Sequence, residues 1–276
     1  MSVDQEIGRG ERFGFGKNWT RFLESLSESR ILSATEALKT LLGLTDLSGK
    51  RFVDVGSGSG LSSLAARRLG ATVVSFDYDP DSVACTRELR GRHDREATTE
   101  WEVHEGSVLD AGFIHSLGQF DVVYSWGVLH HTGGMWRALD QVTRLVAPGG
   151  LLAIAIYNDQ GLASRLWLKV KQIYCGSAPG RLAMCSIFIP YFMARGAAMD
   201  LLGGRSPLTR YGTTGARGMS VVRDWFDWIG GLPFEVARPG QIFDFYRSRG
   251  YELAALTTVG GAMGCNEYVF RSVRSA

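Results

Sequence analysis

Short apolar runs alternate with amphipathic stretches along the middle of the chain. The runs at 51–55, 71–77 and 120–126 are short and nearly continuous, which is typical of strands buried on both faces. Two further strands are predicted at 99–105 and 151–157, and helical spacing of apolar residues separates most of these runs. Strands that alternate with helices in this way predict a parallel sheet covered by helices on both sides.

The two ends of the chain extend this pattern. Apolar residues recur at helical spacing over 18–42, which predicts a helix or a helix pair packed on the core. Near the other end, a helix at 241–249 and a strand at 251–257 precede a glycine turn at 260–264 and a last strand at 266–273. The last two strands are close enough in sequence to form an antiparallel hairpin. Seven strands are therefore expected in all.

Residues 160–236 interrupt the alternation and are interpreted as a helical lid inserted into the fold. They contain a hydrophobic helical stretch, a segment rich in glycine and arginine at 203–218, and a cluster of aromatic residues. The predicted division of the chain is a helical cap segment at 1–48, a core at 49–159, the lid at 160–236, and the rest of the core at 237–276.

Composition and charge narrow the classes of function. The chain has 276 residues, of which 45% are hydrophobic, and its formal net charge is +2. This charge is far from the concentrated basic surface of a nucleic-acid-binding protein, so no DNA partner is expected. The four cysteines show no C-x-x-C pair and no histidine spacing that would build a metal site. These features favour a reduced, cytoplasmic protein.

No membrane span is predicted. The N-terminal residues carry early charges without an apolar run, so no signal peptide is expected there. The most apolar stretch, Leu182 to Ala194, contains Pro190 and is too short to cross a bilayer.

A glycine-rich turn follows the first predicted strand. Gly56, Gly58 and Gly60 stand at alternate positions before a helix, and glycine lets the backbone bend sharply and lets a ligand approach the main chain. Asp77 lies 21 residues beyond Gly56, at the end of the second strand, where a carboxylate can accept both ribose hydroxyls of a nucleoside. A glycine turn alone is often only a tight turn, but the strand, the helix and the acid together favour a nucleoside site. Its G-x-G-x-G spacing differs from the G-x-G-x-x-G of dinucleotide folds, which disfavours an NAD-dependent oxidoreductase.

Five segments in order carry a resemblance to a known family. They read VDVGSGSG, VVSFDYDP, EGSVLD, FDVVYSWGVLHHT and LVAPGGLLAIAIYN. In these segments and the final hairpin, the chain resembles class I S-adenosylmethionine-dependent methyltransferases, especially the small-molecule enzymes of the ubiquinone and menaquinone type. The resemblance implies a doubly wound, Rossmann-like α/β fold with S-adenosyl-L-methionine as cofactor. It also implies methyl transfer to an oxygen, nitrogen or carbon nucleophile of a small-molecule acceptor.

The resemblance also implies which residues bind the cofactor. The glycine loop and Asp54 would surround the methionine part, Asp77 would bind the ribose, and Tyr78 would lie against the adenine. Many relatives have aspartate where this chain has Ser107, so adenine contact there is expected to rest on backbone amides. The residues assigned to the cofactor are Asp54, Gly56, Ser57, Gly58, Gly60, Asp77, Tyr78, Ser107, Val108 and Trp126.

Candidate catalytic residues stand at the carboxyl ends of the fourth and fifth strands. Methyl transfer needs a positioned acceptor, and a base only if the acceptor begins protonated. His130 and His131 could take such a proton, and we expect His130 to lie nearer the acceptor; the alternative is that they cap a helix or hold the loop. Tyr157 could contact the acceptor together with Asn158, or the two could form a turn. Asn266 and Glu267 are interpreted as hairpin residues.

The lid and the N-terminal segment leave several alternatives open. Phe13, Phe15 and Trp19 could fold over the cofactor or anchor the first helix. The apolar run at 185–194 could line an acceptor pocket, form a dimer contact or fill the core of the lid, and some of the closely spaced aromatic residues at 225–228 should cover a cavity or interface. Four arginines could bind an anionic acceptor or simply be solvated: Arg205, Arg210, Arg217 and Arg223. The acceptor is thus expected to be apolar or anionic, and the oligomeric state is open, with a homodimer as one option.

Two other classes of function compete with this interpretation. One is an RNA- or protein-modifying methyltransferase, although the chain lacks the N-P-P-Y type motif of amino methylation and has no cysteine directly after a proline. The other is a module that binds the cofactor without turnover.

Overall fold

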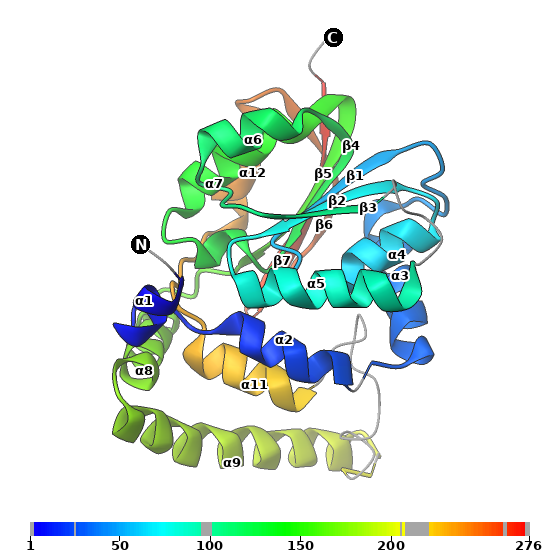
Figure 1. The fold of residues 1–276 in the computed structure, drawn as a ribbon. Coiled ribbons are helices and arrows are strands. Elements are labelled where there is room, and N and C mark those ends of the chain that lie inside the picture. The colour runs from blue at the N-terminus through cyan, green and yellow to red at the C-terminus, as the bar shows by residue number, and fades with distance from the viewer. Residues whose placement is uncertain are drawn as a thin grey trace.

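The fold is that of a computed structural model, which describes residues 3–24, 26–94, 101–204, 206–207, 221–261 and 264–273, without the side chains at 17, 18, 21 and 221–224. Its centre is a seven-stranded sheet in the order β3-β2-β1-β4-β5-β7-β6 (Figure 1). The strands are β1 (Arg51–Val55), β2 (Thr72–Asp77), β3 (Trp101–Glu105), β4 (Phe120–Trp126), β5 (Val146–Tyr157), β6 (Tyr251–Thr257) and β7 (Cys265–Ser272). Strand β7 runs antiparallel to both of its neighbours, and the first five strands are parallel to one another. The predicted doubly wound, mostly parallel α/β fold is confirmed.

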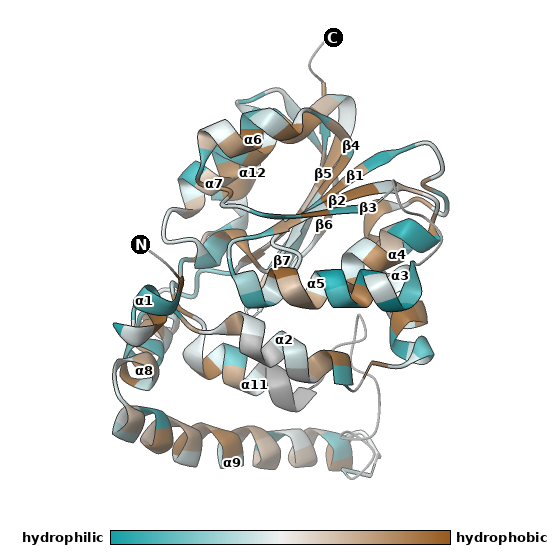
Figure 2. Ribbon diagram, viewed as in Figure 1, coloured by the Kyte–Doolittle hydropathy of each residue, from teal (hydrophilic) through white to brown (hydrophobic). Residues whose placement is uncertain are grey.

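Helices cover both faces of the sheet. One layer consists of α3 (Glu28–Leu42), α4 (Leu61–Arg68) and α5 (Pro80–His93), and the other of α6 (Ala111–Leu117), α7 (Met135–Val142) and α12 (Pro239–Arg247). Successive strand residues face opposite layers, so Phe52 packs in one hydrophobic cluster and Val53 in the other. Figure 2 shows the resulting apolar strands between helices whose outer surfaces are more hydrophilic. Helix α6 was not predicted, because seven residues are too few for a helical spacing of apolar positions to be recognised.

A lid lies beyond the carboxyl ends of the parallel strands (Figure 1). The N-terminal residues contribute α1 (Val3–Gly8) and α2 (Phe15–Glu24), and the insertion contributes α8 (Leu162–Gly176), α9 (Ala178–Leu202) and α11 (Val221–Gly230). For 18–42, where one helix or a helix pair was predicted, the structure has the pair α2 and α3. The lid has a small core of its own, formed by Tyr174, Phe192, Trp225 and Ile229.

Helix α9 corrects the prediction made from its apolar run. The helix has 25 residues and continues through Pro190, so it is not too short to cross a bilayer. Pro190 lies on the exposed side of the helix, where water can bond the carbonyl that loses its N–H partner. Among the residues that the structure describes, α9 is the one helix that is long and apolar enough to span a membrane, judged by length and composition only.

Candidate active site

A cavity of about 1030 Å³ lies between the carboxyl edge of the sheet and the lid. This volume is at the upper end of the range for ligand pockets, so the cavity can hold a nucleoside cofactor together with a second small molecule. Phe13, Phe15 and Trp19 line it from the N-terminal segment, and Trp228 lines it from α11. The loops and strand ends of the core contribute Gly56, Ser57, Gly58, Asp77, Tyr78, Ser107, Val108, Trp126, His131 and Tyr157.

The glycine loop needs glycine for both conformation and space. Gly56 and Gly58 have φ angles of 78° and 54°, in the left-handed region that other residues adopt rarely. A Cβ at Gly56 would lie 2.3 Å from Val128 Cγ1, and one at Gly58 would lie 2.9 Å from Trp19 Nε1. Both glycines therefore leave bare backbone at the cavity. Gly60 instead precedes α4 as its N-cap residue and does not line the cavity.

Asp77 fixes the loop to the second strand. Its Oδ2 accepts a hydrogen bond from Gly58 N–H, and its Oδ1 accepts one from Asp79 N–H, each at 2.9 Å. Each carboxylate oxygen has a second acceptor position, so ligand hydroxyls can still bind. Burial raises the pKa of Asp77 to about 6, although the two N–H donors work against this rise.

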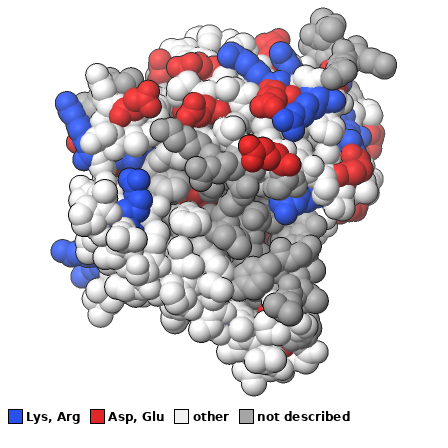
Figure 3. All heavy atoms as spheres, turned by 60° about the horizontal axis from the view of Figure 1, so that its bottom comes forward, with Lys and Arg blue, Asp and Glu red and all other residues white. Residues whose placement is uncertain are grey.

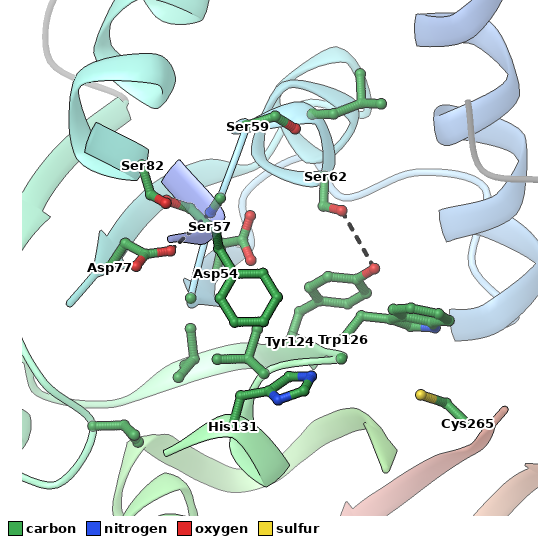
Figure 4. A pocket seen from close by; sticks show the side chains of 18 of the residues that line it. Asp54, Ser57, Ser59, Ser62, Asp77, Ser82, Tyr124, Trp126, His131 and Cys265 are labelled. Carbon is green, nitrogen blue, oxygen red and sulfur yellow. Dashed lines mark hydrogen bonds between the residues drawn. The ribbon is translucent and has the colours of Figure 1, made fainter. Parts of the chain in front are cut away.

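Asp54 lies beneath the loop in the middle of the pocket (Figure 4). It is 2% exposed, and its Oδ2 accepts a 2.6 Å hydrogen bond from Ser63 Oγ. Burial raises the pKa of this carboxyl to about 7, with the Ser63 hydrogen bond opposing the rise. A cationic ligand beside Asp54 would therefore favour its ionised form.

The raised pKa of Asp54 makes the stability of the ligand-free protein depend on pH. The folded-state pKa of about 7 lies above the ordinary value of 3.8, so the stability that protonation contributes is complete below about pH 4 and is lost as the pH rises through 7. We expect Asp54→Asn, which stays uncharged, to have a higher melting temperature than the parent at pH 8 but not at pH 4. Melting curves at both pH values check this, with Asp121→Asn at the opposite end of the sheet as control. A difference that did not change with pH would contradict it.

The N-terminal segment closes the cavity beside Tyr78. The Tyr78 hydroxyl donates a 3.1 Å hydrogen bond to Glu6 Oε1, and the Arg12 guanidinium lies 5.0 Å from the centre of the Tyr78 ring. Arg12 Nε in turn pairs with Glu6 Oε2 at 2.5 Å. Of the two alternatives left open for this segment, the structure shows the first in part: Phe13, Phe15 and Trp19 line the cavity. Glu6 and Arg12 were missed, because no spacing in the sequence connects them to Tyr78.

Ser107 and Val108 line the cavity after β3, as predicted. The Ser107 Oγ accepts a hydrogen bond from Leu109 N–H at 3.1 Å, so this side chain is engaged by its own turn. The side chain of Val108 is buried.

The two histidines differ in their access to the cavity. His131 lines it, whereas His130 is fully buried and does not. The prediction that His130 lies nearer the acceptor is therefore wrong. His130 packs instead beneath Tyr157, whose ring centre is 4.1 Å from its own, and its Nδ1 accepts a 3.4 Å hydrogen bond from Tyr157 N–H. The short 3₁₀ turn Leu129–His131 decides which of the two rings points outward, and the sequence does not reveal that turn.

His131 is held in one tautomer. Its Nδ1 lies 2.6 Å from the carbonyl oxygen of Pro233, which can only accept, so the proton is on Nδ1 and Nε2 has the free lone pair. Burial, assisted by the nearby charge of Lys171, lowers the pKa of His131 to about 3. The imidazole is therefore neutral near pH 7 and is a weak base.

Across the cavity from Asp77, Trp126 and Cys265 form the other side of the pocket (Figure 4). Trp126 Nε1 donates a 2.7 Å hydrogen bond to Glu267 Oε1, and both side chains line the cavity. Glu267 was interpreted as a hairpin residue, and its place in the cavity corrects that interpretation. Strand β7 pairs Glu267 with Ala155 of β5, and no pattern in the sequence reveals this register.

Asn158 and Asn266 do hold the turn at the end of the hairpin. Asn266 Nδ2 donates to Asn158 Oδ1 at 3.1 Å, and Asn158 Nδ2 donates to the carbonyl oxygen of Gly260 at 3.1 Å. Neither asparagine lines the cavity, so of the pair after β5 only Tyr157 does.

The lid predictions have mixed outcomes. Trp228 covers the cavity, as expected of the aromatic cluster. The apolar run at 185–194 does not line it, so that run is no acceptor pocket; Phe192 belongs to the core of the lid, and other residues of the run are exposed. The predicted anion-binding residues Arg205, Arg210 and Arg217, and the side chain of Arg223, lie outside the described residues.

Comparison with known sequences agrees with this geometry. A family model for a methyltransferase domain matches residues 53–152, which include the glycine loop and the histidine pair. A ubiquinone biosynthesis O-methyltransferase of Xanthomonas oryzae is 34% identical over 113 residues, which are 41% of this chain and 45% of that protein. The chain thus spans about half the length of that relative. The enzyme of the same name from Paracidovorax citrulli is 31% identical over 177 residues, which are 61% of this chain and 72% of the relative.

A solved structure extends the likeness to the whole fold. Magnesium protoporphyrin IX methyltransferase from Synechocystis PCC 6803, with bound S-adenosylhomocysteine, superposes with a TM-score of 0.53 at 13% identity over 93% of each chain. At this identity the match shows a shared fold. The matched family model, the relatives and the seven-stranded sheet lead to one conclusion: the chain belongs to the class I S-adenosylmethionine-dependent methyltransferases.

Proposed function

We propose that this protein transfers the methyl group of S-adenosylmethionine to a hydroxyl oxygen of an aromatic small molecule. The observation that carries the proposal is one cavity with two unlike sides. The glycine loop and Asp77 form one side, and Trp126 and Glu267 form the other. The bound cofactor supplies a methyl group that its sulfonium already activates.

The residues of the first side fit the cofactor. Gly56 and Gly58 line the cavity, where bare backbone allows close approach of a ligand. Val128 and Trp19 pack so closely against these glycines that there is no room for a Cβ. Asp77 has acceptor capacity left for ribose hydroxyls. Asp54, buried next to the loop, supplies negative charge for the cationic methionine part.

The second side supports an aromatic acceptor. Phe15, Trp126 and Tyr157 present rings to the cavity, and rings of this kind favour a flat apolar ligand through stacking and edge contacts. Both relatives described above are named O-methyltransferases, which supports oxygen as the methylated atom.

We assign Glu267 to accept the hydroxyl proton and Trp126 to orient its carboxylate. The 2.7 Å hydrogen bond from Trp126 Nε1 holds Oε1, so Oε2 is left for the acceptor. His131 is the weaker candidate for this role, because burial lowers its pKa to about 3. Tyr157 and His130 are assigned to packing: the Tyr157 ring forms a wall of the cavity, with the buried His130 beneath it.

The test is methyl transfer by the purified protein. The protein is incubated with methyl-labelled S-adenosylmethionine and a panel of catechols and phenols, with the matching anilines and methoxybenzenes as controls. We expect label in the hydroxylated compounds only, as acid-stable methyl ethers. Label in the anilines instead, or tight binding of the cofactor without transfer to any hydroxylated aromatic compound, would refute the proposal.

A further inference from the structure

Helix α9 exposes several large apolar side chains along its length. These residues are between 47% and 89% exposed, and charged residues are sparse among them. They are Leu182, Ile187, Tyr191, Met193, Met199, Leu201 and Leu202. We call this set the α9 face.

The α9 face is additional to the surface with which the helix packs in the lid. Phe192, Gly196 and Asp200 are the buried residues of α9, and Phe192 packs on Trp225 of α11 with ring centres 5.9 Å apart. The helix therefore has exposed apolar side chains beyond those that its packing in the lid uses. Figure 2 shows apolar colour along the length of α9, and in Figure 3 the lower part of the view has few charged atoms. Exposed apolar area of this extent marks an interaction site.

The charges beside the α9 face have one sign. The exposed charged residues among the described side chains of α8 and α9 are Arg165, Lys169, Arg181 and Arg195. Asp200 is the one acidic residue of the two helices, and it is buried. Two copies of the chain meeting through this surface would bring cations together without partners. An anionic surface with an apolar interior complements both the charge and the exposed side chains.

Helix α11 connects α9 to a wall of the cavity. Trp228 of α11 lines the cavity and is still 45% exposed, and its ring centre lies 5.7 Å from that of Phe192 on α9. Helix α9 therefore packs against a residue that belongs both to the molecular surface and to the cavity wall.

We propose that the α9 face binds the surface of an anionic lipid bilayer, with the helix lying in the plane of the interface. Because Trp228 lies both at the surface and in the cavity wall, an acceptor dissolved in the lipid can then enter the cavity beside this residue. An in-plane position agrees with the packing, because Trp167 of α8 contacts Phe188 and Phe192 of α9, at 5.0 and 6.3 Å between ring centres. Crossing the bilayer would break these contacts and would place Arg195 and Asp200 in hydrocarbon.

The first test is co-sedimentation with vesicles. The full chain is mixed with vesicles of phosphatidylcholine alone, or of equal parts of phosphatidylcholine and phosphatidylglycerol. We expect binding to the anionic vesicles, and we expect Ile187→Asp to weaken it about tenfold or more, because an apolar side chain that the bilayer would bury is replaced by a charged one. Leu32→Asp is the matched control, because Leu32 is 54% exposed on α3, outside the lid. It should bind like the parent.

The second test examines charge. Neutralising Arg181 and Arg195 together, as Arg181→Gln and Arg195→Gln, should weaken binding to anionic vesicles by roughly 25-fold, because each cation near such a surface contributes about fivefold. Arg247→Gln, on α12, is the control. Binding of the parent should also weaken as salt is added.

Calorimetry with S-adenosylhomocysteine on every variant shows that the fold and the cofactor site are intact, so this proposal and the proposed function can fail separately. Equal sedimentation of the parent and Ile187→Asp would overturn the membrane proposal. So would a parent that fails to sediment and elutes as a dimer which Ile187→Asp dissociates, because that result assigns the α9 face to a second copy of the chain.

Discussion

Replacing Asp77 with asparagine should weaken the binding of S-adenosylhomocysteine about 10- to 100-fold, with little effect on the fold. A hydrogen bond to a charged group contributes about 1.5–3 kcal/mol, and the asparagine side chain has neither the charge nor the second acceptor oxygen. Its amide nitrogen would also face the N–H of Gly58 or of Asp79, each of which now donates to Asp77. Isothermal titration calorimetry measures the loss of affinity.

Asp110→Asn is the matched control for this experiment. Asp110 is the N-cap of α6 and does not line the cavity, and asparagine caps a helix as well as aspartate does. The pH dependence adds a second readout. Since burial raises the pKa of Asp77 to about 6, the affinity of the parent should fall as the pH drops below 6, because the protonated carboxyl accepts hydroxyls poorly. Unchanged affinity in Asp77→Asn would remove this carboxylate from the cofactor site.

Replacing Glu267 with glutamine should lower methyl transfer to a hydroxylated aromatic acceptor by about 10²- to 10⁴-fold, the usual contribution of a general base. Glutamine keeps an oxygen that can accept from Trp126 Nε1, so the geometry of the pair is preserved. The affinity for S-adenosylhomocysteine should stay the same. Initial rates with saturating cofactor and acceptor measure the effect.

A structural role for Glu267 would give a different result. If the carboxylate only anchors Trp126, Glu267→Gln should change KM more than kcat and leave the pH profile of kcat as it is. Glu252→Gln, at an exposed position of β6, serves as control and should be fully active. Activity of Glu267→Gln equal to that of the parent would show that the proton leaves by another route.

The order of strands and helices could be predicted because each parallel strand is a compact apolar run bounded by turn residues. The cofactor side of the cavity was predictable for a related reason. The glycine loop and Asp77 each follow a strand directly, so their positions depend only on local sequence and on the parallel sheet. Helix α6 was not predicted because its seven residues form about two turns, which are too few to show a helical spacing of apolar residues.

The acceptor side depends on contacts between distant segments, and local patterns do not reveal those. Glu267 reaches the cavity through the antiparallel register of β7 against β5. In this register the side chain of Asn266 is fully buried, and that of Glu267 lies on the other face of the strand. His130 and His131 exchange their expected places because a 3₁₀ turn follows β4. The length of α9 was underestimated because Pro190 normally ends a helix, whereas here its exposed position allows the helix to continue.

The contacts of Glu6 and Arg12 with Tyr78 bear on how spent methyl donor is exchanged for fresh. Beside Tyr78 the cavity is closed by the helix α1 and by the polar contacts of Glu6 and Arg12, while α8, α9 and α11 are joined by an aromatic core. Motions of loops and short surface segments take nanoseconds to microseconds. Nucleoside exchange can therefore proceed through the N-terminal side while the helices that face the acceptor stay assembled.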